Sequence, residues 1–281
     1  MNINLAHSPD ADDIFMYYAI YFKWVDTKDY NFSNIALDIE TLNKEALKGT
    51  YDISAISFGM YPLIKDNYAL LRTATSFGNG YGPKIIKRRE ERLKPNFKVA
   101  LSGEYTTNAM LFRLYYPKAR IYYMNFLEIE EAVKSGAVDA GVLIHESILD
   151  FDESLEVEKE MWDIWLELAE ENLPLPLGGM ALRRSIPLNR AIELEEILTK
   201  GVKVANSKKK ELCEELEKRD LVRISDEMLD RYLNMYASSD SIELSSIQIK
   251  ALNRLYKILY KENIDIEDYL IPREYRELRY K

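Results

Sequence analysis

The sequence predicts an α/β protein of two lobes, and three observations support this prediction. Strand-like and helix-like segments alternate twice along the chain, first between about residues 3 and 64 and again between about 84 and 175. Two stretches rich in proline and glycine lie at the junctions of these sets. The length of 281 residues is also more than one compact core usually contains.

The first set begins with "INLAHSPDADDIFMYYAIYF", in which an apolar run, a polar loop and a helix-period pattern follow one another. Its β-α-β-α-β order favours a mostly parallel sheet. The expected elements are a strand at 3–6, a helix capped by Asp10 or Asp12 and ending near Phe22, a strand at 35–42, a short helix ending near Gly49, and a strand that turns at Ser57 into another helix.

The two junctions are expected to be extended crossings. "SFGNGYGPKIIKRRE" (76–90) contains alternating glycines, which favour a hinge; it matches neither G-x-G-x-x-G nor a Walker A loop. "NLPLPLGGMALRRS" (172–185) is the second crossing, and the chain is nearly all helical after about Asn189. We therefore predict one lobe from residues 1–83 and 179–281 and another from 84–178, a layout typical of bilobal binding proteins.

Composition excludes several classes of protein. The net charge of −9 argues against a general nucleic-acid binder, which needs a basic surface. Cys213 is the single cysteine and lies in a charged helical stretch, so neither a disulfide framework nor a cysteine metal cluster is expected. No basic leader and no apolar run of about 20 residues is visible, so we expect a cytoplasmic protein without a membrane partner.

Three loops each follow a strand and open a helix: "HSPDADD" (7–13), "ISFGM" (56–60) and "LSGEYTTN" (101–108). Ligands of open α/β sheets bind beyond the carboxyl ends of the strands, where helix N-termini offer free N–H groups to anions. Ser8, Ser57, Thr106 and Thr107 add hydroxyls at these places, either as ligand contacts or as helix caps. Three such loops around one inferred cleft favour a small anionic ligand.

Asp10, Asp12 and Asp13 have the composition of a metal cluster but are better explained as acids in the first turn of a helix. No histidine partner or spaced fourth acid accompanies them in the sequence, and an EF-hand needs a longer pattern. We therefore expect no metal and no cofactor.

His145 and His7 are the only histidines of the chain. His145 ends the apolar run "AGVLI" and is expected to project from a strand end into the cleft. A neutral imidazole near the working pH is the usual proton acceptor, so His145 is the candidate base, with Glu146 a doubtful partner. His7 follows the first strand and is the rival candidate, expected to contact the ligand or support residues that do.

The segments "SPDADDIFMYYAI", "DISAISFGMYP", "GYGPKII", "VLIHES" and "LPLPLGGMALRR" occur in this order between residue 8 and about 184. Together they resemble the 1,4-dihydroxy-6-naphthoate synthase family of the futalosine route to menaquinone. The resemblance implies a type 2 periplasmic-binding-protein-like fold without a transport role. It also implies a lyase that splits cyclic dehypoxanthinyl futalosine, a small anionic aromatic substrate, into 1,4-dihydroxy-6-naphthoate and dihydroxyacetone.

The resemblance assigns the proton acceptor to His145 of the "IHE" motif. It places substrate-contacting loops at Ala55, Ile56 and Ser57 and at Thr106, Thr107 and Asn108. From their position after the first strand, Ser8 and His7 are also expected near the substrate. Many relatives read "SPCPNDTF" where this chain has "SPDADDIF", so Asp10 adds a negative charge at the expected mouth of the cleft.

Two other functions fit the same layout. Chorismate dehydratase resembles this family in fold and pathway but needs no histidine at position 145. A cytoplasmic solute-binding module would bind a ligand without any chemistry. Replacement of His145 separates the classes, because a lyase loses turnover and still binds, whereas a pure binder has no turnover to lose.

Overall fold

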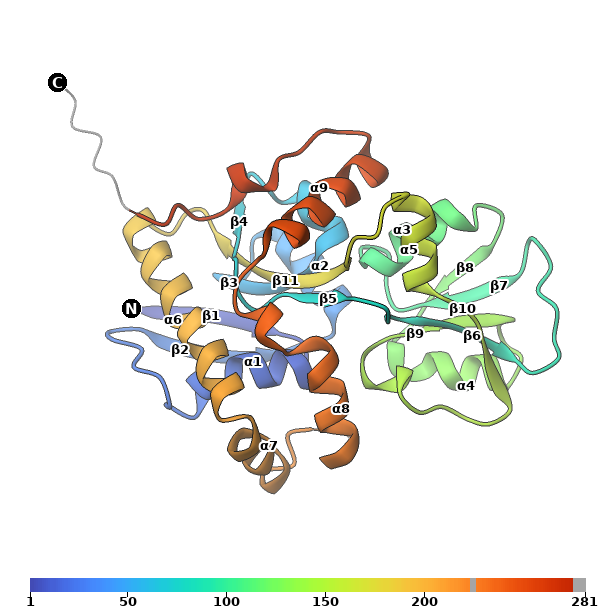
Figure 1. Cartoon of the computed structure of the whole chain (residues 1–281), viewed down its shortest axis with the longest axis horizontal. Coiled ribbons are helices and arrows are strands. Elements are labelled where there is room, and N and C mark those ends of the chain that lie inside the picture. The colour runs from blue at the N-terminus through green and yellow to red at the C-terminus, as the bar shows by residue number, and fades with distance from the viewer. Residues whose placement is uncertain (223–225, 275–281) are drawn as a thin grey trace.

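The strands of the computed structural model form two separate sheets, one in each lobe (Figure 1). The structure describes residues 1–222 and 226–274. The first sheet has the order β2-β1-β3-β11-β4, with β5 paired to β11, and the second has the order β10-β6-β9-β7-β8. The strand bounds are β1 Asn2–His7, β2 Asn31–Ala36, β3 Ile53–Ser57, β4 Tyr68–Leu70, β5 Ser76–Gly78, β6 Lys84–Arg88, β7 Lys98–Leu101, β8 Arg120–Tyr123, β9 Ala140–Leu143, β10 Leu155–Glu160 and β11 Leu175–Arg183.

The first sheet begins as three parallel strands, because β1 pairs in parallel with both β2 and β3. All five residues of β3 are buried, as expected for a central strand with both faces covered. β11 returns antiparallel beside β3 and carries the chain back from the second lobe. In the second sheet, β7 is parallel to β8 and β9, whereas β6 is antiparallel to β9 and β10.

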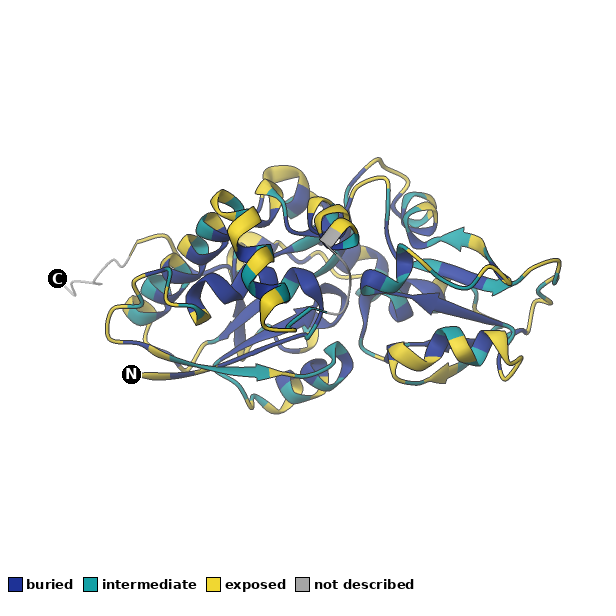
Figure 2. Ribbon diagram, turned by 90° about the horizontal axis from the view of Figure 1, so that it is seen from below, coloured by how far each residue is buried: buried dark blue, intermediate teal, exposed yellow. Residues whose placement is uncertain are grey.

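Helices pack against both sheets, and much of the strands and of the helix surfaces is buried (Figure 2). In the first lobe α1 packs against α6, and Gly201 permits this close approach, since a Cβ there would lie 3.0 Å from the Ile20 side chain. The α-helices are α1 Ala11–Tyr21, α2 Ile39–Lys48, α3 Thr107–Tyr115, α4 Ile129–Lys134, α5 Met161–Ala169, α6 Leu188–Ser207, α7 Lys209–Lys218, α8 Asp226–Tyr236 and α9 Ser246–Tyr260.

The C-terminal helices pack on the first lobe. α6 and α8 both pack on α1, and α9 packs on β11 and on the short 3₁₀ helix η1 (Phe58–Leu63). α9 also contacts α5 of the second lobe. Within the described ranges, no helix combines the length and the apolar character needed to cross a membrane.

Two extended crossings connect the lobes, one leading from β5 into β6 and one entering β11 after α5 (Figure 1). They are hydrogen-bonded to each other, because β5 pairs antiparallel with the start of β11. At the glycine-rich crossing Gly80 has a φ of +81°. A Cβ on Gly78 would lie 2.2 Å from the Tyr81 carbonyl oxygen, so this turn requires glycine.

One predicted element is wrong. The strand expected at 35–42 ends at Ala36, and Ile39 already begins α2. Asp38 ends the strand because its side chain accepts a hydrogen bond from the Thr41 N–H (3.1 Å) and caps the helix. The true strand, "NFSNIA", is a half-exposed edge strand whose polar residues hid it from the apolar pattern.

Candidate active site

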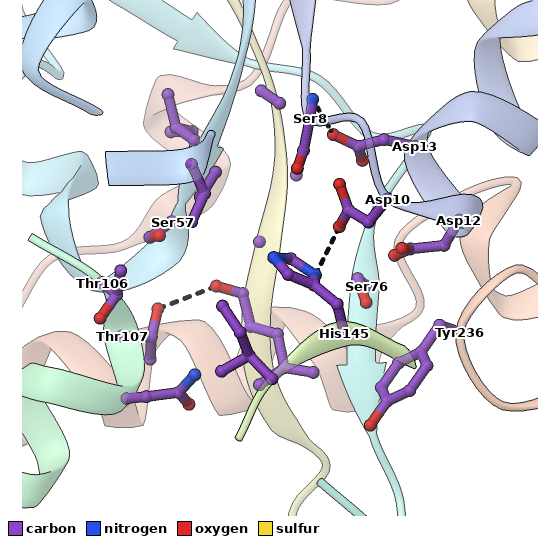
Figure 3. A pocket seen from close by; sticks show the side chains of 18 of the residues that line it. Ser8, Asp10, Asp12, Asp13, Ser57, Ser76, Thr106, Thr107, His145 and Tyr236 are labelled. Atoms are coloured by element: carbon purple, nitrogen blue, oxygen red, sulfur yellow. Dashed lines mark hydrogen bonds and ion pairs between the residues drawn. The ribbon is translucent and has the colours of Figure 1, made fainter. Parts of the chain in front are cut away.

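A cavity lies between the lobes, at the carboxyl ends of β1, β3, β7 and β9 (Figure 3). Its volume of about 90 Å³ is enough for only a few water molecules. The lining residues are Ser8, Asp10, Asp12, Asp13, Ile39, Ala55, Ile56, Ser57, Ala74, Ser76, Pro83, Ser102, Thr106, Thr107, Asn108, Ile144, His145, Leu177, Gly178, Gly179, Tyr232 and Tyr236.

All but one of the residues singled out from the sequence line this cavity, namely Ser8, Ala55, Ile56, Ser57, Thr106, Thr107, Asn108 and His145. The exception is His7, whose ring is buried behind the first loop. There Nδ1 lies 2.6 Å from the Ser8 carbonyl oxygen and Nε2 lies 2.5 Å from Asn34 Oδ1. Both nitrogens are occupied, so His7 supports the loop.

His145 follows β9 and has a φ of +55°, an unusual backbone conformation for a residue other than glycine. Its Nδ1 lies 2.6 Å from Asp10 Oδ2, and Phe126 packs edge-on at 5.0 Å between ring centres. Figure 3 shows this pair at the cavity. The other ring nitrogen, Nε2, has no hydrogen-bond partner among the residues that the structure describes.

Four carboxyl groups gather around this ring, and each has a different partner. Asp10 pairs with His145, and Asp13 accepts the Ser8 N–H at 2.8 Å. Asp12 accepts a hydrogen bond from the Tyr232 hydroxyl at 3.1 Å. Glu146 accepts the Ala11 N–H at 2.8 Å. Asp10 stands at the N-cap position of α1, yet its side chain makes no capping bond, contrary to the sequence prediction.

This arrangement shifts the pKa values of both His145 and Asp10. Burial alone lowers the pKa of His145, but the charge and hydrogen bond of Asp10, with Glu146 and Asp12, outweigh it and raise the pKa to about 9. Burial opposes ionisation of Asp10, but the His145 charge brings its pKa down to about 2. The uncharged ring expected from the sequence is therefore corrected: with these pKa values, His145 and Asp10 form an imidazolium–carboxylate pair near neutral pH.

The pKa values of the neighbouring acids Asp12 and Asp13 are raised, whereas that of Asp10 is lowered. Burial, with the charges of Asp10 and Asp13, raises the pKa of Asp12 well above its usual range. Burial and the charge of Asp10 also raise the pKa of Asp13 to about 7. Like charges this close in a buried site cannot all ionise, so the cluster stores protons beside the cavity.

Asp10, Asp12 and His145 also place one oxygen or nitrogen each within 4.8 Å of one another, which is close enough for a metal ion. In the structure Nδ1 of His145 is bonded to Asp10, and Asp12 accepts the Tyr232 hydroxyl. The histidine partner that the sequence did not show for these acids is therefore supplied by the second lobe.

The opposite wall is made by the start of α3 and by Ser57. Thr106 caps α3, because its hydroxyl accepts the Ala109 N–H at 3.2 Å. The Thr107 hydroxyl accepts the Gly59 N–H (2.9 Å) and donates to the Leu177 carbonyl (2.8 Å), so it joins the lobes (Figure 3). Asn108 Oδ1 has no hydrogen-bond partner within the described part of the chain. No lysine or arginine is among the described residues that line the cavity, so the α3 N-terminus and His145 are the electropositive groups there.

Asn43 holds Ser57 in place and was missed by sequence reasoning. Its amide nitrogen donates to Ser57 Oγ (3.0 Å) and its amide oxygen accepts the Ser57 N–H (2.9 Å). The side chain is fully buried, and α2 carries it to the site. The sequence showed only an asparagine in a short helical stretch, with no signal of its partner.

Asn43→Leu is expected to destabilise the protein by about 2–4 kcal/mol, because it leaves two buried polar groups of Ser57 without partners. Urea unfolding measures the change. Asn189→Leu, at an exposed position of α6, is the control and should change stability by less than about 0.5 kcal/mol. Equal stability of the two variants would contradict the prediction.

The two sheets and the cavity between them define a bilobal α/β architecture. A ligand-binding component of an ABC-type import system from Staphylococcus aureus covers 98% of this chain and 100% of its own, with a TM-score of 0.69 and 11% identity. The aliphatic sulphonate binding protein SsuA from Escherichia coli has a TM-score of 0.61 at 12% identity, covering 100% and 96%. These likenesses confirm the periplasmic-binding-protein-like fold expected from the sequence.

The chain belongs to the menaquinone biosynthesis family, whose model matches residues 3–261. It is 27% identical to the 1,4-dihydroxy-6-naphthoate synthase of Thermus thermophilus over 254 residues, covering 90% of this chain and 92% of that protein. It is 30% identical to the Streptomyces coelicolor enzyme of the same name over 213 residues, covering 72% and 73%. Protein AF1704 from Archaeoglobus fulgidus has a TM-score of 0.84 at 32% identity, covering 92% and 96%. The family expected from the sequence is confirmed.

Proposed function

We propose that this protein is a 1,4-dihydroxy-6-naphthoate synthase, a carbon–carbon lyase of menaquinone biosynthesis. In this proposal it converts cyclic dehypoxanthinyl futalosine to 1,4-dihydroxy-6-naphthoate and dihydroxyacetone, in the cytoplasm. The names of the curated relatives support the reaction. The observation that carries the proposal is an interlobe cavity lined by a single imidazole, whose Nε2 has no hydrogen-bond partner within the described part of the chain.

His145 acts as the proton acceptor. Its Nδ1 is held by Asp10, so Nε2 takes a proton from the substrate once the ring is neutral. The electrons left behind move toward the carbonyl system of the substrate, the bond to the sugar-derived carbon breaks, and the proton returns to the departing fragment. Formation of the aromatic ring drives the reaction, so one well-placed base in a closed cavity suffices.

The substrate carboxylate binds at the start of α3. The Ser57 O–H is available as a donor, because Asn43 already donates to its oxygen. Free N–H groups at the helix start add further donors. Tyr232 and Tyr236 of α8 line the cavity and pack against the substrate ring. Residues 1–83 with 179–281 form one closing body, and residues 84–178 form the other.

The purified protein is expected to convert authentic cyclic dehypoxanthinyl futalosine to the naphthoate in buffer that contains EDTA, because proton transfer by His145 needs no metal ion. Chromatography with fluorescence detection measures the naphthoate, and a known synthase serves as the positive control. Failure to form product while the control enzyme succeeds would contradict the assignment. Dehydration of chorismate instead would show that the protein is the related dehydratase.

A further inference from the structure

The base and its partner come from opposite lobes. Asp10 follows β1 of the first sheet, and His145 follows β9 of the second. Their side chains meet at 2.6 Å, and both are largely shielded from solvent, with 6% of the Asp10 side chain and 14% of the His145 side chain exposed. Such a contact exists only while the two lobes are together.

A second contact reinforces the first. The Ala11 N–H is one of the free donors at the start of α1, and it is bonded to Glu146 of the other lobe rather than to a cap of its own helix. Asp10 and Ala11 of the first lobe are therefore bonded to His145 and Glu146 of the second lobe. The Asp10 side chain, released from capping, reaches the imidazole.

We propose that Asp10 is a positioning residue, which completes the catalytic base by holding the His145 ring from across the cleft. This inference rests on the proposed role of His145. An ionised carboxylate can only accept a hydrogen bond, so Nδ1 must carry hydrogen and Nε2 is the nitrogen left to take a proton. Asp10 thus fixes the orientation and the tautomer of the ring, and closure of the lobes assembles the base.

The charge of Asp10 also makes the ring more basic, although it is not the only charge nearby. Asp12 and Asp13 approach from the start of α1, Glu146 lies beside His145 in the chain, and Tyr232 approaches from α8. Among these groups Asp10 alone has a hydrogen bond to the ring. Replacement of Asp10 by a neutral residue should therefore shift the pKa of His145 more than removal of a charge outside the site would.

Asp10→Asn is the decisive variant, because the amide oxygen still accepts the Nδ1–H while the charge is lost. In the unchanged protein kcat/KM should rise with pH to an inflection near 9. In the variant the inflection should move toward 6.5, the ordinary histidine value. Above pH 9 the variant should be slower than the unchanged protein, because its His145 is a weaker base. Near pH 7 a larger fraction of its His145 is neutral, which offsets this loss of rate. The two profiles should converge or cross as pH falls.

The control is Glu195→Gln, which removes a partly buried carboxylate that pairs with Arg72 outside the cavity and should leave the inflection in place. An unchanged inflection in Asp10→Asn, or an equal loss of activity at every pH, would overturn the inference.

Ring titration by NMR tests the pair without turnover, and the two histidines of the chain make the signals simple to assign. A His145 pKa that falls by about two pH units in Asp10→Asn supports the inference, and an unmoved pKa overturns it. If the protein forms no naphthoate yet the ring titrates as expected, the proposed function fails while the pairing of Asp10 with His145 stands.

Discussion

His145→Ala is expected to lower kcat by about 10²–10⁴-fold, because it removes the only imidazole that lines the cavity. The folded protein should still bind substrate, since the α3 start and Ser57 are untouched. Single-turnover assays measure the loss of the chemical step, and calorimetry with the substrate measures binding. Loss of turnover with retained binding identifies a base.

Two other outcomes would contradict this role. Unchanged turnover would remove His145 from the chemistry altogether. Loss of binding together with turnover would mean that the positive ring anchors the substrate carboxylate instead, as the absence of lining lysine and arginine among the described residues allows. Ser185→Ala, at an exposed position outside the cavity, is a suitable control for handling and folding.

The stability of the ligand-free protein is expected to fall by about 3 kcal/mol between pH 6 and pH 10. The pKa of His145 is about 9 in the folded protein and near 6.5 in the unfolded chain, so the folded state holds this proton more tightly. The stabilisation is complete below pH 6.5 and is lost as pH rises through 9. Asp13, with a pKa raised to about 7, adds a decline in the same direction at lower pH.

Urea unfolding across this pH range measures the effect. Asp10→Asn should flatten the decline between pH 7 and 10, because the variant loses the largest of the charges that raise the pKa of the ring. Glu195→Gln should keep the slope. A stability that stays constant, or rises, from pH 6 to 10 would show that the ring is neutral in the folded protein.

Much of the fold is predictable from the sequence because strand ends carry a local signature. The runs before Ser8, Ser57 and His145 are largely apolar and end at polar residues. The position of these three residues at the carboxyl ends of strands therefore follows from the local sequence. The edge strand β2 escaped prediction, since it is half exposed and partly polar. Its position depends on pairing with β1, which no local pattern records.

The partners within the site were much harder to predict. Asp10 and His145 meet because two loops of different lobes face each other, and their separation along the chain gives no sign of this. The same holds for Asn43 and Ser57. A sequence-based reading therefore found the histidine but assigned it the pKa of an isolated ring, because the neighbouring carboxylate is supplied by tertiary structure.

The pairing of β5 with β11 has a mechanical consequence. Leu175 lies opposite Gly78 and Pro176 opposite Phe77. The two connections between the lobes therefore form one two-stranded ribbon and do not move independently. A two-stranded ribbon bends out of its plane more readily than it shears along its length. The two lobes should therefore rotate about this ribbon as a hinge. Each closure should then bring the same side chains of the two lobes back into contact.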